Sequence, residues 1–153
     1  MHEGMAAMAR YADNDYRWIV ALFSKVDIGR QFNVAGHALL GLRDQVAAAG
    51  MTDREDFCDY RTRDAVLHAR ISRWPVIVLK TDRAALLRRL YLAAREREVP
   101  VNAVLGEMID IDHDTQVANT AAVSVEEARF LCVAVFEKNG QLADLTRKFS
   151  LMR

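Results

Sequence analysis

The fold is decided by two neighbouring stretches of the chain, Trp18-Ile19-Val20-Ala21-Leu22-Phe23 and Asp27-Ile28-Gly29-Arg30-Gln31-Phe32-Asn33-Val34-Ala35-Gly36-His37-Ala38. The first is an unbroken apolar run between polar residues, which is typical of a strand covered on both faces. The second begins a helical periodicity that we place from residue 30 to 49, with Gly50 suited to ending it. A buried strand followed by a long amphipathic helix predicts an α/β protein.

The rest of the chain continues this alternation. Buried strands are predicted at residues 74–79, 101–105 and 130–136, with one helix ending before Pro100 and another following the Asn139-Gly140 turn. Weaker apolar pairs at 57–60 and 66–69 indicate two short strands or a hairpin around Arg63-Asp64, and residues 112–128 fit either a helix or a turn. We expect a three-layer α/β domain over residues 16–153, with a largely parallel sheet, helices on both faces and a loose arm at 1–15.

Two apolar stripes are expected to pack helices against this sheet. They are Phe32, Ala35, Leu39, Leu42 and Val46 on the first long helix, and Leu142, Leu145, Phe149 and Met152 on the last.

The composition narrows the class of protein. The chain has 153 residues, 52% of them hydrophobic and 27% charged, which fits one globular domain and excludes a disordered chain or a multidomain machine. Its 21 basic residues equal its 21 acidic ones, which disfavours nucleic acid as the main partner. Cys58 and Cys132 form no metal-ligand motif and fit a cytoplasmic, reducing environment. No apolar run reaches the ~18 residues that span a bilayer, so no membrane partner is expected.

One side of the first long helix is the first candidate site. Arg30, Asn33 and His37 fall together opposite the apolar stripe, directly after the first buried strand. Arg30 offers a planar fork for a carboxylate or phosphate, Asn33 a donor and an acceptor, and His37 a proton acceptor near neutral pH. The alternative is that these residues simply form the solvated side of the helix.

A second candidate cluster is Asp110-Ile111-Asp112-His113-Asp114. Its carboxylates and imidazole suit acid–base chemistry, whereas the simpler interpretation is that an Asp caps the start of a helix. The chain has no calcium loop, zinc motif, nucleophile elbow, dinucleotide fingerprint or phosphate loop, so neither a metal nor a cofactor is expected.

The segment from Asp27 to Ala38, placed after an apolar strand, resembles the start of the first helix in type 2 peptidyl-tRNA hydrolases. Residues 74–80, the Leu86/Leu90 helix and Val99-Pro100-Val101 resemble their second strand, second helix and third strand. With Asn33 and the stretch from Tyr60 to Ile71, the chain is more similar to domain-of-unknown-function family 2000, an uncharacterised branch of that fold.

This resemblance implies a mixed four-stranded sheet, helices on both faces and a homodimer. Arg30 stands where those hydrolases carry a lysine, their acidic site residue corresponds to Glu107 or Asp110, and their downstream threonines are echoed from Thr115 onward.

We therefore expect a protein that binds a small anionic or amide-bearing ligand. Arg30, Asn33 and Thr115 would bind the ligand, and His37, Asp110 or Glu107 would move a proton if catalysis occurs. One alternative is hydrolysis of an ester or amide, with tRNA kept open as a partner, and another is a non-catalytic dimeric interaction module.

Overall fold

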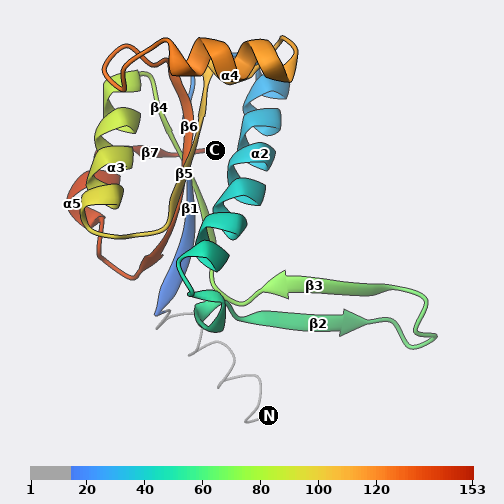
Figure 1. The fold of residues 1–153 in the computed structure, drawn as a ribbon. Coiled ribbons are helices and arrows are strands. Elements are labelled where there is room, and N and C mark those ends of the chain that lie inside the picture. Colours follow the sequence, from blue (N-terminus) through green and yellow to red (C-terminus); the bar gives the residue numbers. More distant parts are fainter. Residues whose placement is uncertain (1–14) are drawn as a thin grey trace.

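A computed structural model describes residues 15–153, and its central sheet has β6 (Phe130–Lys138) and β1 (Tyr16–Phe23) in the middle (Figure 1). The strand order is β5-β6-β1-β4-β7, with β5 spanning Val101–Leu105, β4 Val76–Thr81 and β7 Ser150–Leu151. Residues Trp18–Leu22 of β1 and all of β6 except Lys138 are buried, which their continuous apolar runs predict. Residues 1–14 of the expected arm lie outside the described residues.

The sheet differs from the expected one in strand number and direction. Within residues 15–153 it has five strands rather than four, and only β1 and β4 are parallel neighbours there; the β5–β6, β6–β1 and β4–β7 pairs are antiparallel. A central strand is covered on both faces whichever way it runs, so its apolar pattern does not reveal its direction. The extra strand, β7, is a two-residue edge strand that is too short to leave a pattern in the sequence.

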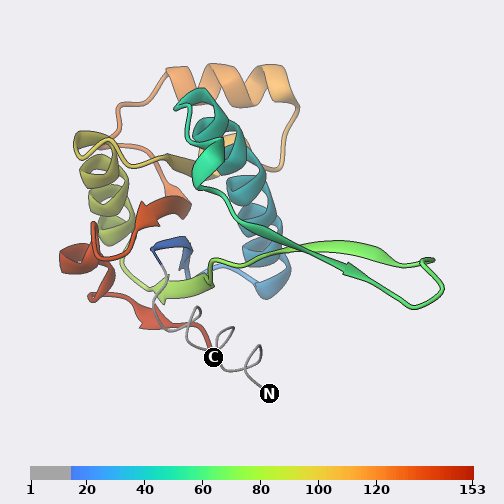
Figure 2. The same cartoon turned by 90° about the horizontal axis from the view of Figure 1, so that it is seen from below.

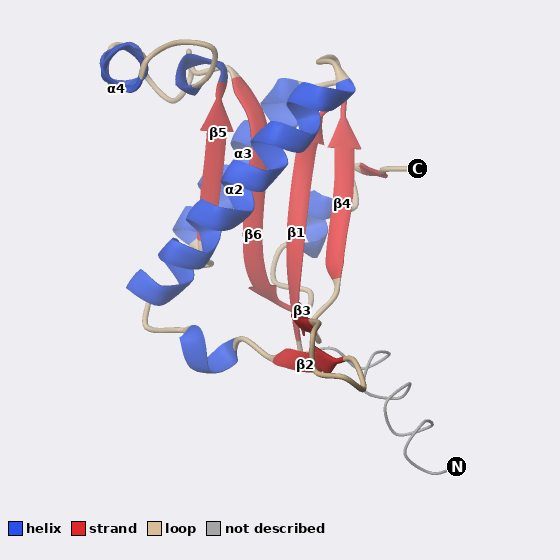
Figure 3. Ribbon diagram, turned by 90° about the vertical axis from the view of Figure 1, so that its right-hand side faces the viewer, coloured by secondary structure: helices blue, strands red, loops and turns tan. Residues whose placement is uncertain are grey.

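Helices cover both faces of the sheet, as expected (Figure 3). The α2 helix (Ile28–Ala48) packs on one face and α3 (Ala84–Glu96) on the other, each within its own apolar core. The α2 residues that face the sheet are Gln31, Val34, Ala38, Leu42 and Val46. The predicted stripe was therefore partly wrong, because Phe32 is 71% exposed. Apolar residues cover more than half of the helix circumference, so periodicity alone does not fix its rotation.

The predicted pair of short strands is confirmed. After the 3-10 turn η1 (Thr52–Arg54), β2 (Phe57–Arg61) and β3 (His68–Ser72) form an antiparallel hairpin that projects away from the sheet (Figures 1 and 2).

The predicted final helix was wrong. Only one helical turn forms, α5 (Ala143–Thr146), and the chain then extends into β7 along the edge of β4. None of the helices in the described part of the chain is long and apolar enough to cross a bilayer.

The undecided region 112–128 contains both a helix and a turn. A 3-10 turn, η2 (Gly106–Met108), leads from β5 toward α4 (His113–Ala121), which lies across the carboxyl end of β5. After α4, Ser124 and Glu127 bond each other reciprocally: Ser124 N–H donates to Glu127 Oε2 at 2.8 Å, and Glu127 N–H donates to Ser124 Oγ at 3.3 Å. This capping-box pattern forms a turn and no further helix.

Candidate functional site

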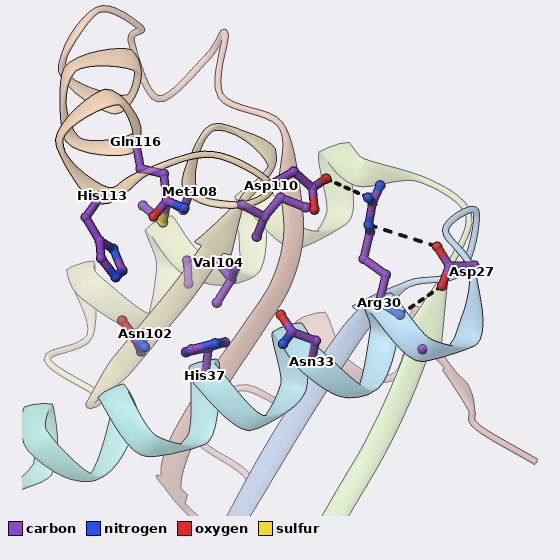
Figure 4. Close-up of a pocket in the computed structure, with 13 residues that line it drawn as sticks. Asp27, Arg30, Asn33, His37, Asn102, Val104, Met108, Asp110, His113 and Gln116 are labelled. Carbon is purple, nitrogen blue, oxygen red and sulfur yellow. Dashed lines mark hydrogen bonds and ion pairs between the residues drawn. The ribbon is translucent and has the colours of Figure 1, made fainter.

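The first wall of the candidate site is the beginning of α2. Asp27 caps this helix, because its Oδ1 accepts a hydrogen bond from Arg30 N–H at 3.0 Å. Arg30, Asn33 and His37 then project from successive turns on one side of the helix (Figure 4). This side of α2 lies next to the face that is buried against the sheet. The three side chains therefore point past the edge of the sheet that β5 forms.

The opposite wall comes from β5 and the segment that follows it. Together the two walls border an open cavity of about 790 Å³. The side chains that line the second wall and carry chemistry are Asn102, Met108, Asp110, His113 and Gln116. His37 from α2 and His113 from α4 point toward the same space from opposite sides (Figure 4). The structure thus brings Arg30, Asn33, His37 and Asp110 together around one cavity.

Asp110 meets Arg30 across the cavity mouth. Arg30 Nη2 lies 2.6 Å from Asp110 Oδ2, and Arg30 Nε lies 4.0 Å from the cap residue Asp27. Asp110 has a φ of 66°, a left-handed conformation that Asp tolerates better than most residues. Both partners are substantially exposed, so the ion pair contributes only about 0–1 kcal/mol to stability. The ion pair is therefore easily loosened, and a ligand can bind the guanidinium donors of Arg30 that Asp110 leaves free.

The lining is close to neutral in charge. It contains one arginine, Arg30, against the carboxylates of Asp27 and Asp110, so its formal charge is −1 when both histidines are neutral. The amides of Asn33, Asn102 and Gln116 add donors and acceptors. Such a cavity suits a ligand with both hydrogen-bond donors and hydrogen-bond acceptors better than it suits a multiply charged anion.

Glu107 lies outside this cavity lining. It is 8% exposed, and it accepts hydrogen bonds from Arg129 Nε at 3.0 Å and from Arg129 N–H at 3.2 Å. Burial raises the pKa of the Glu107 carboxyl, but the hydrogen bonds with Arg129 outweigh burial and hold the pKa below its ordinary value. These contacts tie the end of β5 to the start of β6.

Thr115 also lies outside the lining, where it donates hydrogen bonds to Asp112, the N-cap residue of α4. Its N–H and its hydroxyl donate to Asp112 Oδ1 at 2.9 and 3.0 Å. The backbone hydrogen bond from Thr115 and then its hydroxyl bond lower the pKa of Asp112. For Asp112, helix capping is therefore the interpretation that fits the contacts.

His113 belongs to the candidate cluster Asp110–Asp114, whereas sequence reasoning missed Asn102 and Gln116 of the lining. Asn102 had a detectable signal, because it is a polar residue within the otherwise apolar stretch Val101-Asn102-Ala103-Val104-Leu105. Its Nδ2 donates to Ala38 O of α2 at 3.1 Å, which fixes the side chain and leaves its carbonyl oxygen for the cavity. Gln116 Nε2 donates to Ile111 O at 2.6 Å. Gln116 had no such signal, since its placement depends on where α4 lies.

Across residues 15–153, no three His, Cys, Asp or Glu side chains come close enough together to hold a metal ion.

Fold and cavity together define a three-layer α/β protein with a polar pocket beside its edge strand β5, between α2 and α4. Residues 16–153 match the family model described as "Protein of unknown function (DUF2000)", and the chain belongs to this family. A search of curated proteins finds no match. Among solved structures, the chain is similar to the protein of unknown function Atu0240 from Agrobacterium tumefaciens strain C58, with a TM-score of 0.75 and 20% sequence identity. That likeness covers 92% of this chain and 100% of the other, and it concerns the fold alone.

Proposed function

We propose that this protein binds a small molecule bearing an amide or carboxylate group in the cavity between α2 and α4. The observation that carries the proposal is the convergence of Arg30, Asn33, His37 and Asp110 from two separate segments on one cavity of about 790 Å³. This volume lies within the range of about 300–1,000 Å³ that is typical of small-molecule sites. A merely solvated helix side needs no opposing wall with matching polar groups.

The charges favour an amide-bearing ligand over a strong anion. Asp110 already occupies part of the Arg30 guanidinium, and Asp27 adds a second carboxylate nearby. An amide carbonyl can accept from the free Arg30 donors, while the Asn33 side chain pairs with the amide N–H. The same Arg30 donors accommodate a single carboxylate.

The proposal is tested with N-acetylglycine amide as the probe, compared with acetate and inorganic phosphate. Binding is measured by chemical-shift changes in a ¹⁵N-labelled protein. Arg30→Ala removes a charged hydrogen-bond donor and is expected to weaken binding of N-acetylglycine amide about 10- to 100-fold. Asn33→Ala is expected to weaken it about 3- to 10-fold. The matched control is Arg89→Ala, because Arg89 is an exposed arginine of α3 outside the cavity lining.

Two outcomes contradict this proposal. One is that N-acetylglycine amide binds equally well to Arg30→Ala and to the Arg89→Ala control. The other is that none of the three probes shifts resonances of the cavity residues at millimolar concentration.

A second candidate function is hydrolysis of an ester or amide, with peptidyl-tRNA as the example that the family resemblance supplies. It is favoured by the position of Asp110 and His37 on the same cavity as the Arg30 and Asn33 donors. In this scheme Asp110 or His37 takes a proton from water as its oxygen bonds to the acyl carbon. The C–O or C–N bond then breaks, and the leaving alcohol or amine recovers the proton.

An assay with a peptidyl-tRNA and with an N-acetylamino-acid ester decides this candidate. We expect the wild type to release product, and Asp110→Asn or His37→Ala to lower kcat by about 10²- to 10⁴-fold, the usual contribution of general acid–base catalysis. If the wild type cleaves neither substrate at micromolar enzyme, or if both variants retain full kcat, hydrolysis through these residues is rejected.

A homodimer is the third proposal, in which the chain would act as an interaction module. It is supported by the exposed apolar side of α2, where Ile28, Phe32 and Leu40 are all more than half exposed. A two-fold pairing would let the same residues of two copies cover one another. Light scattering after size exclusion is expected to give twice the monomer mass, and Phe32→Asp the monomer mass. A monomeric wild type at 100 μM removes the proposal.

A further inference from the structure

The outer edge of β5 carries backbone groups with no strand beside them. β5 is the first strand in the order β5-β6-β1-β4-β7, so it has a neighbour on one side only (Figure 3). Pro100 O accepts a hydrogen bond from Phe136 N–H at 3.1 Å, and residues pair in the register Val101 with Val135. In an antiparallel pair, the backbone N–H and C=O groups of successive residues point alternately toward the partner strand and away from it. The backbone groups of residues 100, 102 and 104 therefore point toward β6, and those of Val101, Ala103 and Leu105 point outward.

Ala103 is the outward residue whose peptide groups lie beside the proposed site. The Leu105 N–H is already used, because it donates to Met108 Sδ at 3.5 Å. Within the described residues, neither the N–H nor the C=O of Ala103 has a partner on the outward side. Ala103 therefore presents one donor and one acceptor at the edge of the sheet, as a strand does to the next strand.

This edge separates two cavities. The polar cavity described above lies on the α2 side, and a second cavity of about 340 Å³ lies on the α3 side. Asn102, Ala103 and Met108 line both of them. The second cavity, named here the apolar cavity, is lined mainly by Tyr91, Leu105, Val123, Val125, Ala128 and Phe130. Met108 lines both spaces with a flexible thioether side chain, which adapts easily to a bound group.

We propose that β5 recognises an N-acylated amino acid amide whose apolar side chain enters the apolar cavity. The Ala103 C=O accepts from the acylamino N–H of the ligand, and the Ala103 N–H donates to the carboxamide carbonyl on the other side of the same α-carbon, which is the pairing used when a peptide adds to a sheet edge. The polar end of the ligand lies in the polar cavity near Arg30 and Asn33. The substrate class is thus an N-acylated amino acid amide with an apolar side chain. This inference rests on the proposed function and narrows its ligand.

Three probes separate the contributions. N-acetyl-L-phenylalanine amide has the amide and the apolar group, N-acetylglycine amide lacks the benzyl group, and the acetate ester of 3-phenyllactamide replaces the N–H by oxygen. Burial of the benzyl group is expected to tighten binding about 10- to 100-fold relative to the glycine probe. Loss of one hydrogen bond is expected to weaken the ester about 3- to 10-fold relative to the phenylalanine probe. The Ala103 amide resonance is expected to shift with the phenylalanine probe.

One variant tests each contact, the hydrogen bond to Ala103 and the apolar cavity. Ala103→Pro removes the outward N–H at a position where an edge strand tolerates proline, and it is expected to weaken the phenylalanine probe about 3- to 10-fold. Ala103→Gly keeps the N–H and is the matched control. Val125→Asp places a charge in the wall of the apolar cavity and is expected to reduce binding of the phenylalanine probe but not of the glycine probe. If Ala103→Pro fails to fold, Val125→Asp and the three probes still decide.

The results distinguish this inference from the proposed function. If N-acetylglycine amide binds in an Arg30-dependent way but the benzyl group adds no affinity, or the ester binds as well as the amide, the β5 inference is overturned and the proposed function stands. If no probe binds, both are overturned.

Discussion

Gly41→Ala is a sharp test of how α2 and β5 are held together at the site. A Cβ atom at position 41 would lie 2.2 Å from Asn102 Nδ2 and 3.0 Å from its Cγ. The Asn102 amide would have to move by about 1 Å to restore an ordinary contact of roughly 3.5 Å. That movement breaks the hydrogen bond from Asn102 Nδ2 to Ala38 O, whose length is 3.1 Å. Gly41 is thus the residue that allows Asn102 to reach α2.

Two energies of similar size oppose each other in this variant. Alanine stabilises the interior of a helix by about 1 kcal/mol relative to glycine. Loss of the Asn102 hydrogen bond destabilises the protein by about 0.5–1.5 kcal/mol. Gly41→Ala is therefore expected to leave the free energy of unfolding within about 0.5 kcal/mol of the wild type. In an Asn102→Ala background there is no amide to displace, so Gly41→Ala should stabilise by about 1 kcal/mol.

Urea unfolding of the four proteins in this cycle measures the coupling between the two positions, which we expect to be about 1 kcal/mol. The displaced Asn102 carbonyl should also lower the affinity of N-acetylglycine amide about 3- to 10-fold. This role of Gly41 is refuted if Gly41→Ala stabilises the wild-type background by a full ~1 kcal/mol while the Asn102 side-chain NMR signals stay unchanged.

Three further predictions concern other parts of the chain. The pKa of Glu107 is lower in the folded than in the unfolded protein, so its contribution to stability is present above the unfolded pKa and is lost as the pH falls through the folded pKa. Glu107→Gln should therefore reduce the loss of stability in acid, measured by urea unfolding at pH 3 to 6. Burial raises the pKa of the Cys132 thiol to about 12, so a thiol reagent at pH 8 should modify only the partly exposed Cys58 in the native protein and both cysteines in urea. Phe136→Ala should lower the free energy of unfolding by about 3–5 kcal/mol, because its ring is fully buried and stacked on two aromatic rings; an effect below 1 kcal/mol would contradict that packing.

The order of strands and helices could be predicted from the sequence because the buried runs are long and well separated. β1, β4, β5 and β6 all formed close to where their apolar residues indicate, and α2 ends beside Gly50, which has a φ of 68°. The direction of β6 could not be predicted, since burial on both faces removes the alternation that marks an antiparallel strand. The spacing of Leu142, Leu145, Phe149 and Met152 imitates a helix although the chain leaves α5 after one turn to pair with β4.

The candidate site shows the same division between local and tertiary information. Arg30, Asn33 and His37 share one side of α2 as a matter of helix geometry, so their grouping was predictable. The choice between Glu107 and Asp110 was not, because it depends on contacts distant in sequence: Arg129 takes the Glu107 carboxylate, whereas Asp110 turns to Arg30. Glu107 thus lies outside the cavity and Asp110 lies on it, although they are only three positions apart.

The edge position of β5 explains why the cavity can form at this side of the sheet. β5 has a partner on one side only, and α4 lies beyond its carboxyl end rather than along its length. The gap left beside the strand is bordered by α2 on one face and α3 on the other, which places a polar cavity and an apolar cavity on either side of Ala103. A sixth strand paired with β5 would occupy the outward peptide groups of Ala103. The open edge is therefore the feature on which both the proposed ligand site and the proposed amide recognition depend.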